Sequence, residues 1–420
     1  MINLIEIGSK AKQSAKMLAV TSTAQRNAVL EEIAALLLEH RDRILEANAK
    51  DIANAHQKGL NEAMIDRLMI TPQRLEGMAT DVRRVIELPD PLGEVFDEQI
   101  LPNGLKVYKQ RVPLGVLGVI YESRPNVTVD VSGLALKSGN AVILRGGSET
   151  IESNRALVQL IHLALSRHRL PVDAVQFIDD PDRRYVLEML KLHQFIDLII
   201  PRGGAKLHQF CKENSQIPVV IGGIGICHLF VDESADLQKA VEVIFNAKVQ
   251  RPTVCNALDT LLVHRKVAAD LLPKVFERLG AAGVTFRLHE NVFHQLNISP
   301  SECLQKAEAG DFDVEWLSLV LGVKIVDDLD EAIRHIEEHS TGHSDGILSS
   351  NPVRIEEFLH RVDSAAVYVN ASTRFTDGGQ LGLGAEVAVS TQRLHARGPM
   401  GLRELTSYKW VIIGDGHVRV

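Results

Sequence analysis

The chain of 420 residues is longer than one hydrophobic core usually supports, so its length predicts two domains, or two domains with a small appendage. Apolar residues make up 45% and charged residues 24% of the sequence, which is typical of a soluble globular protein, and no apolar run reaches the roughly 18 residues that span a bilayer. The formal net charge of −8, with Lys and Arg scattered along the chain, argues against a nucleic-acid-binding surface.

The first residues, MINLIEIGSKAKQSAKML, lack the basic and then apolar order of a signal peptide, so we expect a cytoplasmic protein. The four cysteines are Cys211, Cys227, Cys255 and Cys303. They form no CxxC pair and are too sparse for a disulfide framework or a zinc site. The histidines include no HExxH motif. We therefore expect free thiols and no bound metal.

The N-terminal part of the chain predicts helices followed by a β-hairpin. Apolar positions at helical spacing between residues 24 and 55 predict one or two packed helices. From Gly93 to Arg111 the pattern changes to short extended pieces around the turn signal Pro102-Asn103-Gly104, which predicts a hairpin. The C-terminal run from Ser407 to Val420 alternates in the same way, so it could pair with the hairpin in a small extra sheet at a subunit contact.

Strand-like and helical segments then alternate in two series. The first has predicted strands at 115–121, 141–144, 174–178 and 197–200, with helices at 154–167 and 183–192. The second begins near Val231 and has predicted helices at 234–249, 266–280 and 329–339, with strands at 258–263 and 319–326. Such alternation indicates βαβ units, and hence an α/β fold with parallel sheets covered on both faces.

Cys255 lies at the junction between a helical pattern and a short apolar run, in the stretch NAKVQRPTVCNALDTLLV. A thiol is the strongest nucleophile among side chains at neutral pH, and a nearby helix end or cation makes it more reactive. Lys248 and Arg251 precede it closely. Many cysteines are inert core residues, but Pro252 and Asn256 place this one outside the apolar run. We interpret Cys255 as the candidate nucleophile.

Three glycine-rich turns follow predicted strands, namely RGG at 145–147, RGGAK at 202–206 and GGIG at 222–225 after PVVI. Glycine lets backbone amides approach a phosphate, and the N-terminus of a following helix favours the anion. None of the turns matches GxGxxG, and each alone is explained by a plain connection from strand to helix. Together they favour a dinucleotide site, in which Arg145 could meet a 2′-phosphate.

Four longer motifs carry a family resemblance: YESRPNVT at 121–128, LKSGNAVILRGG at 136–147, NAKVQRPTVCN at 246–256, and YVNASTRFTDGGQLGLGAEVAVSTQRLHARGPMGL at 368–402. With them the chain resembles, essentially from end to end, the γ-glutamyl phosphate reductases of the aldehyde dehydrogenase superfamily. The resemblance implies a Rossmann-type cofactor domain at 1–92 and 112–231 and an α/β catalytic domain at 232–384. It also implies a β oligomerisation flap at 93–111 and 403–420, and a return segment to the cofactor domain at 385–402.

The resemblance implies an activity as well. It is the NADPH-dependent reduction of L-glutamyl 5-phosphate to L-glutamate 5-semialdehyde and phosphate through a cysteine thioester, the second step of proline biosynthesis from glutamate. A homo-oligomer is expected, with no nucleic-acid or membrane partner. An association with glutamate 5-kinase, which makes the substrate, stays open.

In this reaction Cys255 would attack the acyl carbon, and negative charge would develop on the carbonyl oxygen. The resemblance places Asn126 and the Cys255 backbone N–H where they stabilise that charge, although Asn126 also fits a turn residue after a proline. Arg124 and Arg374 lie inside family motifs and are candidates for binding the anionic groups of the substrate, because Arg suits carboxylate and phosphate.

The cofactor residues follow from the same comparison of motifs. Arg145, Gly203 and Gly204 belong to the glycine-rich turns that we assign to the dinucleotide. Glu315 matches the superfamily glutamate that holds the nicotinamide ribose, or else it is a solvated carboxylate at a helix end.

Oxidising members of the superfamily carry a glutamate before the cysteine that activates water, whereas the stretch IPVVIGGIGICH at 217–228 has no carboxylate. Its absence favours reduction over hydrolysis. Two alternatives stay open. A Cys–His thiol hydrolase would need a histidine such as His228 or His264 oriented onto Cys255, without a local signature for it. A dinucleotide-binding module would use Cys255 only structurally.

Overall fold

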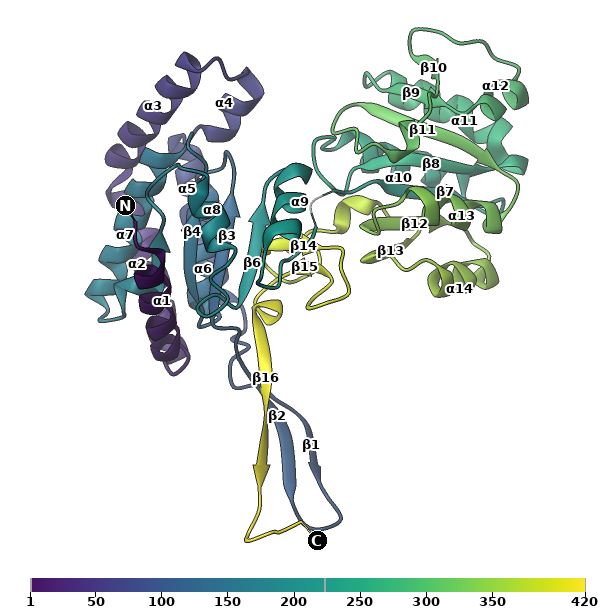
Figure 1. Ribbon diagram of the computed structural model, residues 1–420. Coiled ribbons are helices and arrows are strands. Elements are labelled where there is room, and N and C mark those ends of the chain that lie inside the picture. Colours follow the sequence, from purple (N-terminus) through teal and green to yellow (C-terminus); the bar gives the residue numbers. More distant parts are fainter. Residues whose placement is uncertain (1, 223, 420) are drawn as a thin grey trace. The chain divides into compact units, whose positions relative to one another are not determined.

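The computed structural model describes residues 2–222 and 224–419 (Figure 1). The chain forms two compact units. The first contains the described residues up to Ile221 together with Gly382–Ala388 and the chain from Met400 onward, and the second contains Gly222–Leu381 and Val389–Pro399. The sequence pattern placed the change of domain at 231, whereas the strand at 227–231 pairs with strands of the second unit.

The first unit is built on a four-stranded parallel sheet with the order β5-β4-β3-β6. Its strands are β3 (Val116–Tyr121), β4 (Ala141–Arg145), β5 (Val175–Phe177) and β6 (Leu198–Arg202). All four were predicted, and β3 and β4 are buried along their whole length, as expected of strands covered on both faces. The apolar run PVVI is not a strand of its own. It makes only an isolated bridge, between Val219 and Ile199.

Helices cover this sheet. They are α1 (Leu4–Leu18), α2 (Thr23–Glu39), α3 (Arg41–Gln57), α4 (Glu62–Leu68), α5 (Pro72–Glu87), α6 (Asn126–Lys137), α7 (Ile151–Arg167), α8 (Arg184–Met189) and α9 (Ala205–Asn214), with 3₁₀ turns at Val172–Ala174 and Arg403–Leu405. Helices α6 and α7 connect β3 to β4 and β4 to β5, in one direction across the sheet, whereas α8 lies in the connection from β5 to β6 in the other direction. Because such crossovers are right-handed, α8 lies on the face of the sheet opposite to α6 and α7. The direction in which the chain adds strands to the sheet changes between β3 and β6, and open α/β sheets bind ligands at such a position.

A three-stranded antiparallel sheet forms the rest of the first unit (Figure 1). Its strands are β1 (Val95–Ile100), β2 (Lys106–Pro113) and β16 (Thr406–Ile413), in the order β1-β2-β16. The predicted hairpin and its pairing with the C-terminal run are thereby confirmed. Lys109 Nζ lies 4.8 Å from the ring centre of Tyr408 and 5.0 Å from that of Trp410. The short strands β14 (Ala388–Ser390) and β15 (Gly398–Met400) pair where the chain passes between the units.

The second unit is built on a seven-stranded parallel sheet with the order β10-β9-β11-β8-β7-β12-β13. Its strands are β7 (Cys227–Val231), β8 (Leu258–His264), β9 (Thr285–Leu288), β10 (Leu304–Lys306), β11 (Val320–Val326), β12 (Ser344–Leu348) and β13 (Ala366–Val369). Its helices are α10 (Leu237–Val249), α11 (Arg265–Gly280), α12 (Glu290–Leu296), α13 (Leu329–His339) and α14 (Pro352–Arg361), with 3₁₀ turns at Asp311–Asp313 and Thr373–Phe375. The predicted elements are present among them.

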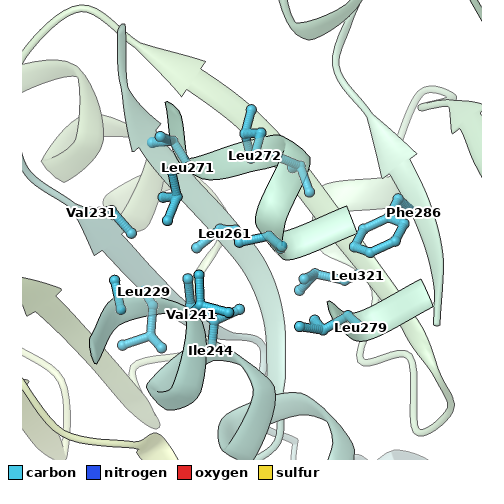
Figure 2. Close-up of a cluster of buried hydrophobic side chains, with 14 of the residues drawn as sticks. Leu229, Val231, Val241, Ile244, Leu261, Leu271, Leu272, Leu279, Phe286 and Leu321 are labelled. Carbon is cyan, nitrogen blue, oxygen red and sulfur yellow. The ribbon is translucent and has the colours of Figure 1, made fainter. Parts of the chain in front are cut away.

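Two apolar clusters lie on the two faces of this sheet. Leu229 and Leu261 pack with side chains of α10 and α11 in the cluster that Figure 2 shows. Their neighbours Phe230 and Leu262 belong instead to the cluster with α13 and α14. Because successive side chains of a strand point to opposite faces, these uninterrupted apolar runs serve two cores at once. The α/β fold predicted from the sequence is confirmed. No helix in the described ranges is long and apolar enough to cross a membrane.

Candidate active site

A pocket of about 730 Å³ lies in the first unit, at the carboxyl ends of β3 and β4 and beside the start of α9. Four cationic side chains line it, those of Lys58, Arg145, Arg183 and Lys206. The volume is typical of a ligand pocket, and its place beside the change of crossover direction is typical of a nucleotide site. The cations suit a ligand with several phosphates. Of the four, Arg145 and Lys206 belong to the glycine-rich turns assigned to a dinucleotide from the sequence, whereas Lys58 and Arg183 were not predicted, because exposed Lys and Arg are too common to be informative.

Arg145 is buried at the end of β4. Its Nη1 donates to the Gly146 carbonyl at 2.9 Å and its Nη2 to the Pro181 carbonyl at 2.7 Å. Burial lowers the pKa of the guanidinium, and the charge of Glu149 opposes this change. Each Nη keeps a further N–H, and Nε is buried without a hydrogen-bond partner in the described structure. Arg145 therefore reaches the pocket with donors that its own contacts do not use.

Gly203 and Gly204 form the turn that leads into α9. A side chain at Gly203 would collide with the Glu122 carboxylate, because a Cβ there would lie 2.4 Å from Glu122 Oε2. The Gly204 N–H donates to the same oxygen at 3.3 Å. A carboxylate thus lies at the helix N-terminus, where the turn was predicted to meet phosphate. The sequence analysis missed Glu122, although it directly follows β3 within the motif YESRPNVT.

Asn126 is the first residue of α6, where its side chain is exposed. Its Nδ2 donates to Asp130 Oδ2 at 2.8 Å, one helical turn further on. Burial raises the pKa of the Asp130 carboxyl group to about 6, although the hydrogen bond from Asn126 opposes the change. The amide keeps one N–H for another acceptor.

Arg124 is exposed in the turn that leads from β3 into α6. The preceding residue, Ser123, has a left-handed φ of 49°. This uncommon conformation is held by Glu149 Oε1, which accepts from the Ser123 N–H at 2.8 Å and from its Oγ at 2.9 Å. Glu149 therefore fixes the turn that presents Arg124 and Asn126.

Cys255 is half-buried in the turn between α10 and β8, as predicted from its place in the sequence. Its neighbour Asn256 anchors this turn. The Asn256 Nδ2 donates to the Thr376 carbonyl at 2.9 Å, and its carbonyl accepts from Thr373 Oγ1 at 2.7 Å. The Cys255 carbonyl accepts from the Cys227 thiol at 3.2 Å.

Arg374 is the cation that interacts with Cys255. Its Nε donates to Gln250 Oε1 at 2.8 Å. Burial lowers the pKa of Arg374, and so does the charge of Arg251, whereas the Cys255 thiol raises it. The charge of Asp377 raises the pKa of Arg374 as well. Arg374 thus places a positive charge near the Cys255 thiol, which favours a thiolate. Lys248, close to Cys255 in sequence, is buried and forms an ion pair with Asp259 instead.

Glu315 lies against the segment before β7. Its Oε1 accepts from the Gly225 N–H at 3.0 Å. Gly225 in turn packs on the peptide of Cys255, since a Cβ at Gly225 would lie only 1.5 Å from the Cys255 carbonyl oxygen. Burial raises the pKa of Glu315 to about 7, and the charge of Asp259 acts in the same direction. Glu315 is therefore not a solvated helix-end carboxylate.

The glycines of the segment before β7 are needed for close packing. A Cβ at Gly222 would lie 1.8 Å from the Val389 carbonyl oxygen. Gly223 lies outside the described residues. A glutamate at Gly222, in the place where the oxidising relatives keep theirs, would require the backbone to move.

The two histidines weighed for a thiol hydrolase have other partners. His228 is buried, with its Nδ1 3.1 Å from Asp345 Oδ1, and His264 Nδ1 caps α11 by accepting from the Lys266 N–H at 3.2 Å. Neither contact orients a ring onto Cys255. In the parts of the chain that the structure describes, no three His, Cys, Asp or Glu side chains are grouped so that they could hold a metal ion. The expectation of no metal stays a prediction.

Known proteins show the same organisation along the whole chain. A sequence profile of the "Aldehyde dehydrogenase family" matches residues 4–296. The chain is 56% identical over 423 residues to the γ-glutamyl phosphate reductase of Roseiflexus castenholzii, covering 100% of both, and 55% identical over 416 residues to that of Escherichia coli O1:K1, covering 99% and 100%. The solved structure of γ-glutamyl phosphate reductase from Thermotoga maritima matches with a TM-score of 0.97 and 47% identity over 100% of both chains. The chain belongs to the aldehyde dehydrogenase family, in the branch of the γ-glutamyl phosphate reductases.

Proposed function

We propose that this chain reduces L-glutamyl 5-phosphate to L-glutamate 5-semialdehyde and phosphate with NADPH, through a thioester on Cys255. The observation that carries the proposal is the half-buried thiol of Cys255, anchored in a turn beside Arg374 in a chain 56% identical to a γ-glutamyl phosphate reductase. The reaction would be the second step of proline biosynthesis from glutamate. A cytoplasmic location and a homo-oligomer belong to the same proposal.

The acyl transfer takes place on the thiol of Cys255 in the second unit. The Cys255 sulfur forms a bond to the acyl carbon, and the bond from that carbon to the phosphate oxygen breaks, so that phosphate leaves with the electron pair. Arg374 and Arg251 supply positive charge for the thiolate and for the anionic groups of the substrate. Arg124, exposed in the first unit, is the other proposed substrate residue.

The negative charge that develops on the carbonyl oxygen requires donors. We assign this role to the Cys255 backbone N–H and to the Asn126 amide, whose second N–H is free of the bond to Asp130. Loss of one such donor typically lowers the rate by roughly 10²- to 10³-fold.

The pocket of the first unit fits NADPH. The unpartnered Nε of Arg145 and the cations around it suit phosphate groups, with Arg145 assigned to the 2′-phosphate and the turn at Gly203 and Gly204 to the pyrophosphate. Glu315 is assigned to the hydroxyls of the nicotinamide ribose. When bound, NADPH supplies the hydride for the thioester carbonyl. The Cys255 thiolate then leaves, and the aldehyde is released.

A reductase must protect its thioester from water. The described residues of the segment from Ile217 to His228 contribute no carboxylate, and the close contacts at Gly222 and Gly225 leave no room for one. This supports reduction over hydrolysis, since no base in that segment activates water.

The reverse reaction is the sharpest test. The enzyme should sustain reduction of NADP⁺, followed at 340 nm, only when glutamate semialdehyde and phosphate are both present, and without phosphate it should form at most one NADPH per active site. NAD⁺ in place of NADP⁺ should give a lower kcat/KM. Repeated turnovers with NADP⁺ in the absence of phosphate or arsenate would show that water takes the acyl group, and the proposed reaction would then be wrong.

A further inference from the structure

The second unit contains a buried ion pair that the proposed chemistry does not use. Lys248, in the last turn of α10, and Asp259, in β8, are almost fully buried, and Lys248 Nζ lies 3.4 Å from Asp259 Oδ1. Desolvation makes a buried pair a poor source of stability, since apolar residues of similar volume often stabilise a core as well or better. Stability alone therefore does not explain why this buried ion pair is present.

Asp259 has a second partner that offers an explanation. Its Oδ1 also accepts from the backbone N–H of Trp316 at 3.2 Å. Trp316 lies in the loop between β10 and β11 and directly follows Glu315. Lys248 thus fixes a carboxylate in the core, and the carboxylate fixes the loop residue next to Glu315.

The contacts continue to the nucleophile. Glu315 accepts from the Gly225 N–H at 3.0 Å, and Gly225 packs directly on the Cys255 carbonyl. Cys227, two residues after Gly225, donates its thiol to the same carbonyl at 3.2 Å. These contacts connect the carboxylate of Glu315, which we assign to the nicotinamide ribose, with the turn that bears the Cys255 thiol.

We propose that Asp259, held by Lys248, is a positioning residue that fixes the loop carrying Glu315 for cofactor binding. The inference rests on the proposed function only in the role given to Glu315. The charge of Asp259 also reaches Glu315, whose pKa it raises.

Two double variants separate the hydrogen bond from the charges. Lys248→Met with Asp259→Leu removes both charges and the acceptor for the Trp316 N–H. Lys248→Met with Asp259→Asn removes the same charges but keeps an acceptor oxygen. The Leu variant should speed amide hydrogen exchange in peptides covering residues 312–318, on the order of tenfold, and raise the KM for NADPH by a similar factor, whereas the Asn variant, which loses Lys248 but keeps the acceptor, should show a smaller effect on both. The KM for the acyl phosphate should stay near that of the wild type.

Lys239→Met is the matched control, because Lys239 lies on the same helix in an exposed pair with Asp236. Unchanged exchange in the folded Leu variant would overturn the proposal, and so would equal effects in the Leu and Asn variants. If the Leu variant does not fold, Lys248→Met with Asp259→Ala replaces it. Glu315→Gln separates the positioning role proposed for Asp259 from the ribose-binding role proposed for Glu315. Should it leave the KM for NADPH unchanged, the role of Glu315 fails, while hydrogen exchange still tests Asp259.

Discussion

The four cysteines differ in their surroundings, and these differences favour Cys255 as the proposed nucleophile. Burial raises the pKa of Cys227 well above its ordinary value and that of Cys211 to about 11. Cys303 is exposed. Cys255 alone combines partial exposure with an interaction with Arg374. Thiolate character, rather than exposure alone, determines reactivity.

Cys255→Ser should lower the rate of acyl phosphate reduction by more than tenfold, because a serine hydroxyl is a far weaker nucleophile at neutral pH. Binding of NADPH, measured by fluorescence titration, should stay near that of the wild type. Cys303→Ser is the matched control and should keep full activity. A serine variant of Cys255 with a tenth of the activity or more would contradict the thioester mechanism.

The sequence predicted the place of Cys255 but not the contacts that hold it. The junction could be read from the helical pattern before it and the apolar run after it. The anchoring bonds from Asn256 to Thr373 and Thr376 join residues more than a hundred positions apart, and no local pattern reports such contacts. Lys248 shows the same limit, since its proximity in sequence to Cys255 suggested a cation for the thiol and its side chain pairs with Asp259.

At the scale of elements, the start of α9 carries an unexpected anion. Glu122 Oε2 accepts from the Gly204 N–H at the site assigned to the pyrophosphate. A negative charge near a helix N-terminus is stabilised by about 0.3–1 kcal/mol, but here it competes with phosphate for the same donors.

Glu122→Gln should therefore tighten NADPH binding, by roughly two- to fivefold, since the amide keeps the volume and removes the charge. Isothermal titration calorimetry at low ionic strength would measure the Kd. Glu188→Gln on α8, which removes a charge that does not line the pocket, is the control. Weaker binding in the Glu122 variant would mean that its carboxylate assists the cofactor.

The sheet β1-β2-β16 presents apolar side chains on an edge strand. Tyr408, Trp410 and Ile412 are 47%, 52% and 64% exposed along β16. Long apolar edge strands are rare in monomers because they pair with other chains. This supports the prediction that the sheet mediates subunit association.

Trp410→Lys combined with Ile412→Lys should yield smaller species by light scattering, with an unchanged far-ultraviolet circular dichroism spectrum. Val353→Lys, at a 71% exposed position on α14 of the second unit, provides the control for added charge. If the double variant has the same mass as the wild type, the prediction that this sheet mediates subunit association is wrong.

Several of the elements that the sequence did not predict are short. Strands β9 and β10 have only 4 and 3 residues, and β13 is only partly buried at the edge of its sheet, so none of them shows a distinct pattern. Helix α4, with 7 residues, is also too short for a reliable period. The longer helices α1, α5 and α6, with 15, 16 and 12 residues, were not predicted either, so length alone does not separate the predicted elements from the others.

At the scale of the whole molecule, buried neutral histidines make the stability of the second unit depend on pH. Burial lowers the pKa of His335 to about 2 and that of His343 to about 4. The unfolded chain takes up these protons below pH 6.5, whereas the folded unit does not. The stabilising contribution is therefore complete above pH 6.5 and is lost as the pH falls toward the folded pKa.

Between pH 7 and pH 5, each histidine should account for a loss of about 2 kcal/mol in the free energy of unfolding. His335→Phe should reduce that loss by about this amount, because Phe keeps the edge contact with Phe312 and does not titrate. Urea unfolding at both pH values measures the difference, and His360→Gln at an exposed position is the control. Equal pH dependence in wild type and His335→Phe would contradict this account.

The two compact units explain why the boundary could not be predicted. The polypeptide crosses between them several times, and β7 joins the second sheet by pairing with β8 and β12. Strand pairing between residues far apart in sequence does not change the local amino-acid composition, so composition could not predict the domain boundary. The end-to-end resemblance carried the functional interpretation instead, because it depends on motifs in both units.

In the proposed reaction of the whole molecule, acylation precedes the use of the cofactor, and this order makes the half-reaction testable in the intact enzyme. Formation of the thioester on Cys255 needs no cofactor, whereas hydride transfer also requires NADPH, which we assign to the pocket of the first unit. Without NADPH, acylation should therefore stop after one turnover. The carboxylate of Glu315 accepts from the N–H of Gly225, which packs on the Cys255 carbonyl, and it lies outside the segment from Ile217 to His228.

Mixing the enzyme with glutamyl phosphate in the absence of NADPH should release one burst of phosphate equivalent to the active sites. The acylated enzyme should then resist water, and added phosphate or arsenate should reverse the acylation, because the leaving-group site accepts either anion. Cys255→Ser should give no burst, and Glu315→Gln should leave the burst unchanged. Sustained release above the uncatalysed rate would show that a residue activates water. If Glu315→Gln abolished that release, Glu315 would be the base, and its assignment to the ribose would fail along with the explanation of why this chain reduces its thioester.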